Sequence, residues 1–163
     1  MIYIIDFYNK IVNNILHFFP AAILLALVLT LLYGRVLRKN NQISFFFFCI
    51  YFVLLTGETL WGRLGMDIAT EDFIGIRQLF ENPWYMAAAV DNVIMFMPFG
   101  FLAVRVITSA KPRQKCLIAA LVTSGCIELL QYVLRIGEAQ LVDILANFLG
   151  AAAGSLFRKR SGD

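Results

Sequence analysis

The sequence predicts an all-α protein, a polytopic transmembrane helix bundle of about five spans. The first observation is composition: of 163 residues, 60% are hydrophobic, 14% aromatic and only 15% charged. A soluble domain usually has about 45–50% apolar and about 25% charged residues. Such a chain cannot cover a water-facing surface with polar groups, so the lipid bilayer is its expected solvent.

The second observation is the spacing of apolar runs. A spanning helix needs about 20 mostly apolar residues, with a range of about 17–25. Five runs qualify, at residues 15–33, 43–60, 87–106, 116–134 and 141–157, and the last is the shortest and most polar. No basic leader precedes the first run and no clear cleavage site follows it, which predicts that the run is retained. Without internal repeats or low-complexity linkers, residues 1–163 are predicted to form one integral membrane domain.

The third observation is the position of the basic residues, because Lys and Arg mark the cytoplasmic side of a membrane. Ten of the fourteen fall in clusters after the first, third and fifth runs: Arg35, Arg38, Lys39, Arg105, Lys111, Arg113, Lys115, Arg158, Lys159 and Arg160. This pattern predicts an outside amino terminus and an inside carboxyl terminus. It also argues against a nucleic-acid partner, since the net charge of +3 is divided among short clusters between apolar runs.

The segment 61–86 between the second and third runs mixes acids with aromatic residues. It is predicted to be either a short amphipathic helix on the outer membrane surface or a structured loop that caps the bundle. The Asn82-Pro83 step is expected to end any helix formed there.

Ionisable residues inside a span are unfavourable by about 2.5–3.5 kcal/mol each, so each needs a reason. In the predicted topology, the second to fifth spans each carry one acid in the outer half, and spacing of three or four residues places some polar groups on one helix face. These residues form a candidate ligand-binding layer: Glu58, Asp91, Asn92, Glu128, Gln131, Arg135, Asp143 and Asn147. The alternative is that they only pair with one another to hold the bundle together.

Helix-breaking and small residues form a second, structural set. Pro98 removes a backbone donor and is predicted to kink the third span, with Gly100 close behind it. Gly150 and Gly154 are spaced for close helix contact in a membrane.

No motif identifies a catalytic residue, a resident metal or a cofactor. The chain lacks a Gly-rich phosphate loop, H-E-x-x-H and G-x-S-x-G, and it has a single histidine. Cys49, Cys116 and Cys126 lie within or at the edge of apolar runs without C-x-x-C spacing, as expected of packing residues. Carboxylates in one layer would suit Mg²⁺ or Ca²⁺, or equally a cationic or hydroxyl-rich ligand.

Three ordered motifs resemble those of the VanZ-like family of bacterial membrane proteins: D-N-V-I-M-F-M-P-F-G-F-L at 91–102, I-E-L-L-Q-Y at 127–132 and V-D-I-L-A-N-F-L-G at 142–150. The family pattern is N-x-x-x-F-x-P-F-G, then E-x-x-Q, then D-x-x-x-N-x-x-G. The resemblance covers residues 87–157. It implies a cytoplasmic-membrane protein with an accessory role in resistance to teicoplanin and other lipoglycopeptides, exerted without a change in the peptidoglycan precursor.

Three functional hypotheses follow. The first is resistance through an outward-facing intramembrane polar site that binds a lipoglycopeptide or a lipid-linked cell-wall precursor. The second is an intramembrane enzyme acting on a lipid-linked substrate, with Asp91, Glu128 and Asp143 as metal ligands or acid–base groups. The third is a small lipid or solute transporter, which the predicted break at Pro98 favours. The sequence does not fix the oligomeric state.

Overall fold

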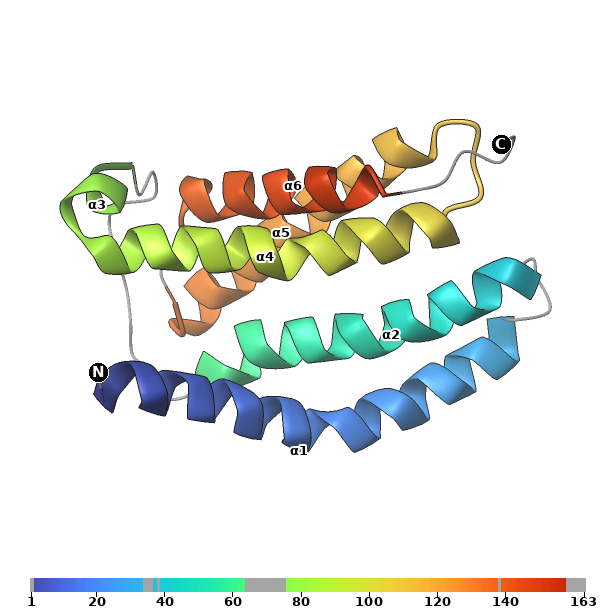
Figure 1. The fold of residues 1–163 in the computed structure, drawn as a ribbon, viewed down its shortest axis with the longest axis horizontal. Coiled ribbons are helices and arrows are strands. Elements are labelled where there is room, and N and C mark those ends of the chain that lie inside the picture. Colours follow the sequence, from blue (N-terminus) through green and yellow to red (C-terminus); the bar gives the residue numbers. More distant parts are fainter. Residues whose placement is uncertain (1, 34–36, 38, 64–75, 138, 158–163) are drawn as a thin grey trace.

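The protein is an all-helical bundle, seen here in a computed structural model that describes residues 2–33, 37, 39–63, 76–137 and 139–157 (Figure 1). Its elements are α1 (Ile2–Tyr33), α2 (Lys39–Thr59), the 3-10 turn η1 (Trp61–Arg63), α3 (Ile76–Glu81), α4 (Pro83–Val106), α5 (Pro112–Leu134) and α6 (Leu141–Ser155). The long helices alternate in direction. The end of α1, the start of α2, the end of α4, the start of α5 and the end of α6 all lie at one end of the bundle (Figure 1).

Local sequence signals set several helix ends. The Asn82 side chain accepts a hydrogen bond from the Trp84 backbone N–H at 3.0 Å, and Pro83 occupies the first turn of α4, where a missing N–H is tolerated. The expected helix stop at Asn82-Pro83 is therefore confirmed, and α4 begins four residues earlier than predicted. At the other end of the bundle, Pro112 starts α5 in the same way.

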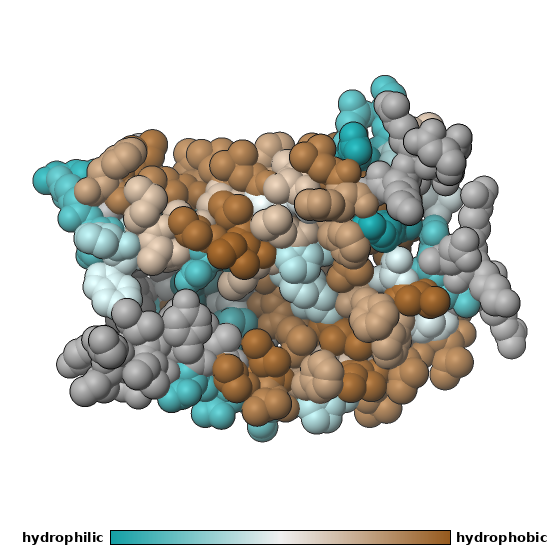
Figure 2. Space-filling model, in the orientation of Figure 1, coloured by the Kyte–Doolittle hydropathy of each residue, from teal (hydrophilic) through white to brown (hydrophobic). Residues whose placement is uncertain are grey.

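Four helices are long and apolar enough to cross a membrane: Val12–Tyr33, Asn41–Thr59, Pro83–Val106 and Pro112–Leu134. The fifth predicted span is shorter than expected, since α6 has 15 residues and a length of about 22 Å against a hydrocarbon core of about 30 Å. The surface is brown over most of its middle and teal toward its two ends (Figure 2). This distribution is that of a multi-pass membrane protein whose exposed leucines and phenylalanines face lipid.

Pro98 does not interrupt α4, which is a single helix from Pro83 to Val106, and the predicted kink at this residue stays a prediction. Pro98 lies on an exposed side of α4, where its ring does not face a neighbouring helix. One observation in favour of a transporter, a discontinuous third helix, is therefore removed.

The closest helix packing is that of α4 on α6. A Cβ atom added at Gly150 would overlap the carbonyl oxygen of Val93, one at Gly154 that of Met97, and one at Gly100 that of Ala151. Glycine at these positions lets the two backbones touch, as small residues do in membrane helix pairs. The predicted close contact at Gly150 and Gly154 is thus present, and Gly100 supplies the matching surface on α4.

Candidate functional site

Buried polar side chains gather at one end of the bundle, where α5, α6 and the end of α2 meet. We call this set the polar cluster: Thr59, Ser124, Glu128, Gln131, Gln140 and Asn147, each less than 9% exposed. Because unpaired polar groups are unfavourable inside an apolar bundle, their hydrogen bonds decide what the cluster can do.

Gln131 connects α5 to the end of α2. Its Nε2 donates to the Thr59 backbone carbonyl at 3.0 Å, while the Thr59 hydroxyl donates within its own helix to Leu55. Residue 131 lies one turn beyond Glu128, so both side chains project from the same face of α5.

Glu128 is the acidic side chain of the cluster. Its Oε2 accepts a hydrogen bond of 3.1 Å from the Gln140 backbone N–H, immediately before α6. Asp143, half-buried in the first turn of α6, and Arg63 in η1 both lie near enough to Glu128 to act on it electrostatically. Asp143 of α6 and Arg63 of η1 are therefore neighbours of the polar cluster, and Glu128 of α5 is the acid within it.

A third bond joins α5 to α6 one turn deeper in the bundle. Asn147 Nδ2 lies 2.8 Å from Ser124 Oγ, and both side chains are buried. Residues 124, 128 and 131 follow one stripe of α5, as the sequence predicted.

The other predicted site residues lie elsewhere. Glu58 faces α1, where its Oε2 accepts a bond of 3.3 Å from Asn14. Asp91 and Asn92 are half-buried on α4, one turn before Met95 and Phe96. Arg135 is largely exposed and ends α5 in the left-handed conformation, with φ 55°.

The arrangement of the carboxylates bears on metal binding. Among the residues that the structure describes, no group of three or more His, Cys, Asp or Glu side chains lies close enough to hold a metal ion. Asp91, Glu128 and Asp143 are therefore not grouped as three joint ligands in this structure.

Sequence reasoning did not select Thr59 or Gln140 for the site. Both contribute backbone groups, a carbonyl at Thr59 and an N–H at Gln140, and a backbone group has no sequence signal of its own. Arg63 had a weak sequence signal for a place near the site, because it is a single basic residue just beyond the second predicted span.

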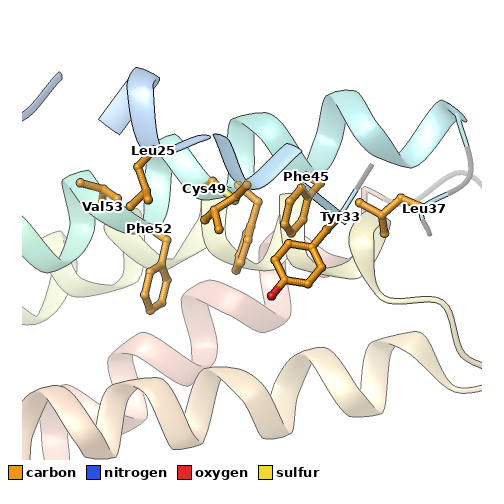
Figure 3. A pocket seen from close by; sticks show the side chains of 9 residues that line it. Leu25, Tyr33, Leu37, Phe45, Cys49, Phe52 and Val53 are labelled. Carbon is orange, nitrogen blue, oxygen red and sulfur yellow. The ribbon is translucent and has the colours of Figure 1, made fainter. Parts of the chain in front are cut away.

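A separate hollow of about 460 Å³ lies between α1 and α2 (Figure 3). Side chains of both helices line it, among them Leu25 and Leu29 of α1 and Phe45 and Phe52 of α2. None of the described residues that line it is charged, and most are aliphatic or aromatic, so it differs in kind from the polar cluster.

Residues 43–159 of the chain match the model of the VanZ/LLP1 family. No curated protein and no solved structure gives a significant match. The family match includes all of α4, α5 and α6 and every residue of the polar cluster. Since it covers more than half of the sequence, the chain belongs to the VanZ/LLP1 family.

Proposed function

We propose that this protein lies in a bacterial cytoplasmic membrane and lowers susceptibility to teicoplanin and related lipoglycopeptides. In this proposal the polar cluster binds a membrane-borne ligand, either the drug or a lipid-linked cell-wall precursor. The observation that carries it is the concentration of buried acid and amide groups, from three elements, at a single end of an otherwise apolar bundle.

The distribution of charge in the sequence supports an outward-facing cluster. The three basic clusters follow α1, α4 and α6, and those helices end at the opposite end of the bundle from Gln140 (Figure 1). With basic residues in the cytoplasm, Glu128 and Gln131 face the outer leaflet. Lipoglycopeptides and exported cell-wall precursors are met on that side.

A role limited to holding the helices together is the main alternative. A buried acid is poorly suited to holding helices together. Glu128 accepts one backbone hydrogen bond, and a second acid, Asp143, lies near it. The alternative predicts that neutral, near-isosteric replacements leave resistance unchanged.

The test is a teicoplanin and vancomycin susceptibility panel in a Gram-positive host that expresses wild type or a variant. We expect wild type to raise the teicoplanin threshold, and Glu128→Gln and Asp143→Asn to reduce that gain at least fourfold, about 0.8 kcal/mol in binding terms. Asp91→Asn, on α4, tests whether an acid outside the polar cluster also contributes to teicoplanin resistance.

The matched control is Glu81→Gln, which neutralises an exposed acid whose partner is Arg77, 2.8 Å away in α3. Membrane abundance is measured for every variant. Full resistance with Glu128→Gln and Asp143→Asn at normal abundance would assign both acids to structure, and no resistance from wild type would reject the role itself.

A further inference from the structure

The chemistry of the ligand can be inferred from an acceptor that the fold leaves unused. Gln131 is 2% exposed, and its Oε1 has no hydrogen-bond partner among the described residues. Its orientation is fixed, because Nε2 donates to the Thr59 carbonyl, which can only accept. Exchanging the two amide atoms would place oxygen against oxygen, so Oε1 is an acceptor in this position.

A second buried acceptor lies in the same cluster. Asn147 is 3% exposed, and its Oδ1 also has no partner within the described part of the chain. Its Nδ2 is used by Ser124, as described above. Native proteins rarely leave such groups unpaired, and those that remain mark places where a ligand, ion or water completes the bonding.

A glycine lies beside the Gln131 acceptor. A Cβ at Gly137 would lie 3.2 Å from Gln131 Oε1 and 2.8 Å from Arg63 Nη1. Any side chain at 137 would thus press on both groups. The backbone at Gly137 does not require a glycine for its conformation, since its φ is not in the left-handed region.

These unused hydrogen-bond acceptors determine which chemical groups of a ligand fit the cluster. The two amide oxygens without partners among the described residues, those of Gln131 and Asn147, can only accept hydrogen bonds, and the acids Glu128 and Asp143 lie near them. A phosphate or carboxylate brings only more acceptors and negative charge. A quaternary ammonium brings positive charge but no N–H. A group with N–H or O–H donors satisfies the orphaned oxygens.

We propose that the polar cluster recognises a hydrogen-bond-donating headgroup, a primary ammonium or a hydroxyl, on a membrane-borne molecule, with Gln131 Oε1 as the acceptor. This inference rests on the proposed function, in which the cluster is a ligand site. It adds the class of group that enters and the atom that receives it.

The test uses three short-chain lipids that share phosphate and acyl chains: phosphatidylethanolamine (ammonium), phosphatidylglycerol (hydroxyls) and phosphatidylcholine (neither donor). Purified protein in detergent is titrated while the fluorescence of Trp61 is followed. The Trp84→Phe background makes Trp61 the single reporter, since the chain has two tryptophans. Trp61 begins η1, two residues after the carbonyl that Gln131 holds.

We expect the ethanolamine or the glycerol lipid to bind about tenfold more tightly than the choline lipid, the value of one hydrogen bond to a buried acceptor. A preference for ethanolamine alone identifies an ammonium site, and a preference shared by glycerol identifies a hydroxyl site. Equal affinity for all three lipids overturns the inference.

Two variants test the assigned atom. Gln131→Leu should abolish the preference, while Gln131→Glu, which restores an acceptor, should keep it. Gly137→Ala removes no hydrogen-bonding group of the cluster and should reduce the preference by crowding Oε1, so the test does not depend on the Leu variant folding. A preference unchanged in a folded Gln131→Leu or Gly137→Ala protein contradicts the assignment.

The inference and the proposed function can fail separately. Equal lipid affinities together with loss of resistance in Glu128→Gln reject the donor headgroup and leave the resistance role standing. Unchanged susceptibility in Glu128→Gln rejects the resistance role, whatever headgroup the cluster prefers.

Discussion

The α4–α6 and α1–α2 pairs are both apolar helix pairs of the same bundle, but they pack in different ways. Between α4 and α6, glycines bring backbone against backbone, beside a core that includes Phe96 and Phe99. Between α1 and α2, the contacts are made by side chains around Ala22, Ala26 and Cys49. The hollow of about 460 Å³ opens beside them (Figure 3).

The difference shows where the helices approach most closely. In lipid there is little hydrophobic driving force between helices, so association depends on close packing and interhelical hydrogen bonds. The closely packed pair α4 and α6 lies wholly within the family match, whereas α1 lies outside residues 43–159. One helix of the closely packed pair, α6, also contributes Asn147 to the polar cluster.

The largest expected effect is at Gly154. Gly154→Ala would place a Cβ against the Met97 carbonyl and the Phe101 backbone, and neither can rotate away as a side chain can. We expect the free energy of unfolding to fall by about 3 kcal/mol, the upper range for overpacking. Unfolding in mixed detergent micelles, followed by circular dichroism, measures it.

The control for that substitution is Gly125→Ala in α5. Nothing lies within 4 Å of the added methyl group, so stability should be unchanged or slightly higher. Equal losses at positions 125 and 154 would mean that glycine acts through helix flexibility and not through the α4–α6 contact.

An intermediate effect on stability is expected where α2 contacts α4. The Tyr51 hydroxyl of α2 donates to the Met95 carbonyl of α4. Tyr51→Phe should lower the free energy of unfolding by about 1 kcal/mol, the usual value of one interhelical hydrogen bond. Tyr33→Phe, at an exposed tyrosine on the hollow, is the matched control and should change it by less than about 0.5 kcal/mol.

The smallest effect is expected in the α1–α2 pair. A Cβ at Gly57 would meet Phe18 Cδ2 at 2.9 Å, which is the end of a ring that can turn toward lipid. Gly57→Ala should therefore lower the free energy of unfolding by less than about 1 kcal/mol in the same assay. A loss as large as that of Gly154→Ala would remove the contrast between the two pairs.

Much of the architecture could be read from composition and spacing. Apolar runs located the four long helices, Asn82-Pro83 located the boundary before α4, and the spacing of Gly150 and Gly154 indicated a close contact. These features are local, since each depends on residues within a few turns of one another. The exact length of α6, two residues shorter than the predicted run, and the unbroken course of α4 through Pro98 were not predicted.

The candidate site was also predicted only in part from the sequence. Helical spacing alone put Glu128 and Gln131 on one stripe with Ser124, and the motif residues Asp143 and Asn147 on one helix. It did not predict that Glu58 accepts a hydrogen bond from Asn14 of α1. This contact depends on which helix packs beside which, and that information is not contained in the spacing within one helix.

The sequence by itself determined that this chain is a multi-pass helical membrane protein of the VanZ/LLP1 family with polar residues in its spans. Hydropathy and motif spacing are properties of the chain and need no fold to be read. Only the tertiary structure decided which polar groups meet. It used the backbone of Thr59 and Gln140 to satisfy Gln131 and Glu128, and it left the Gln131 and Asn147 oxygens without partners among the described residues. Hydrogen bonds between distant segments form only when packing brings those segments within about 3 Å, which no local pattern specifies.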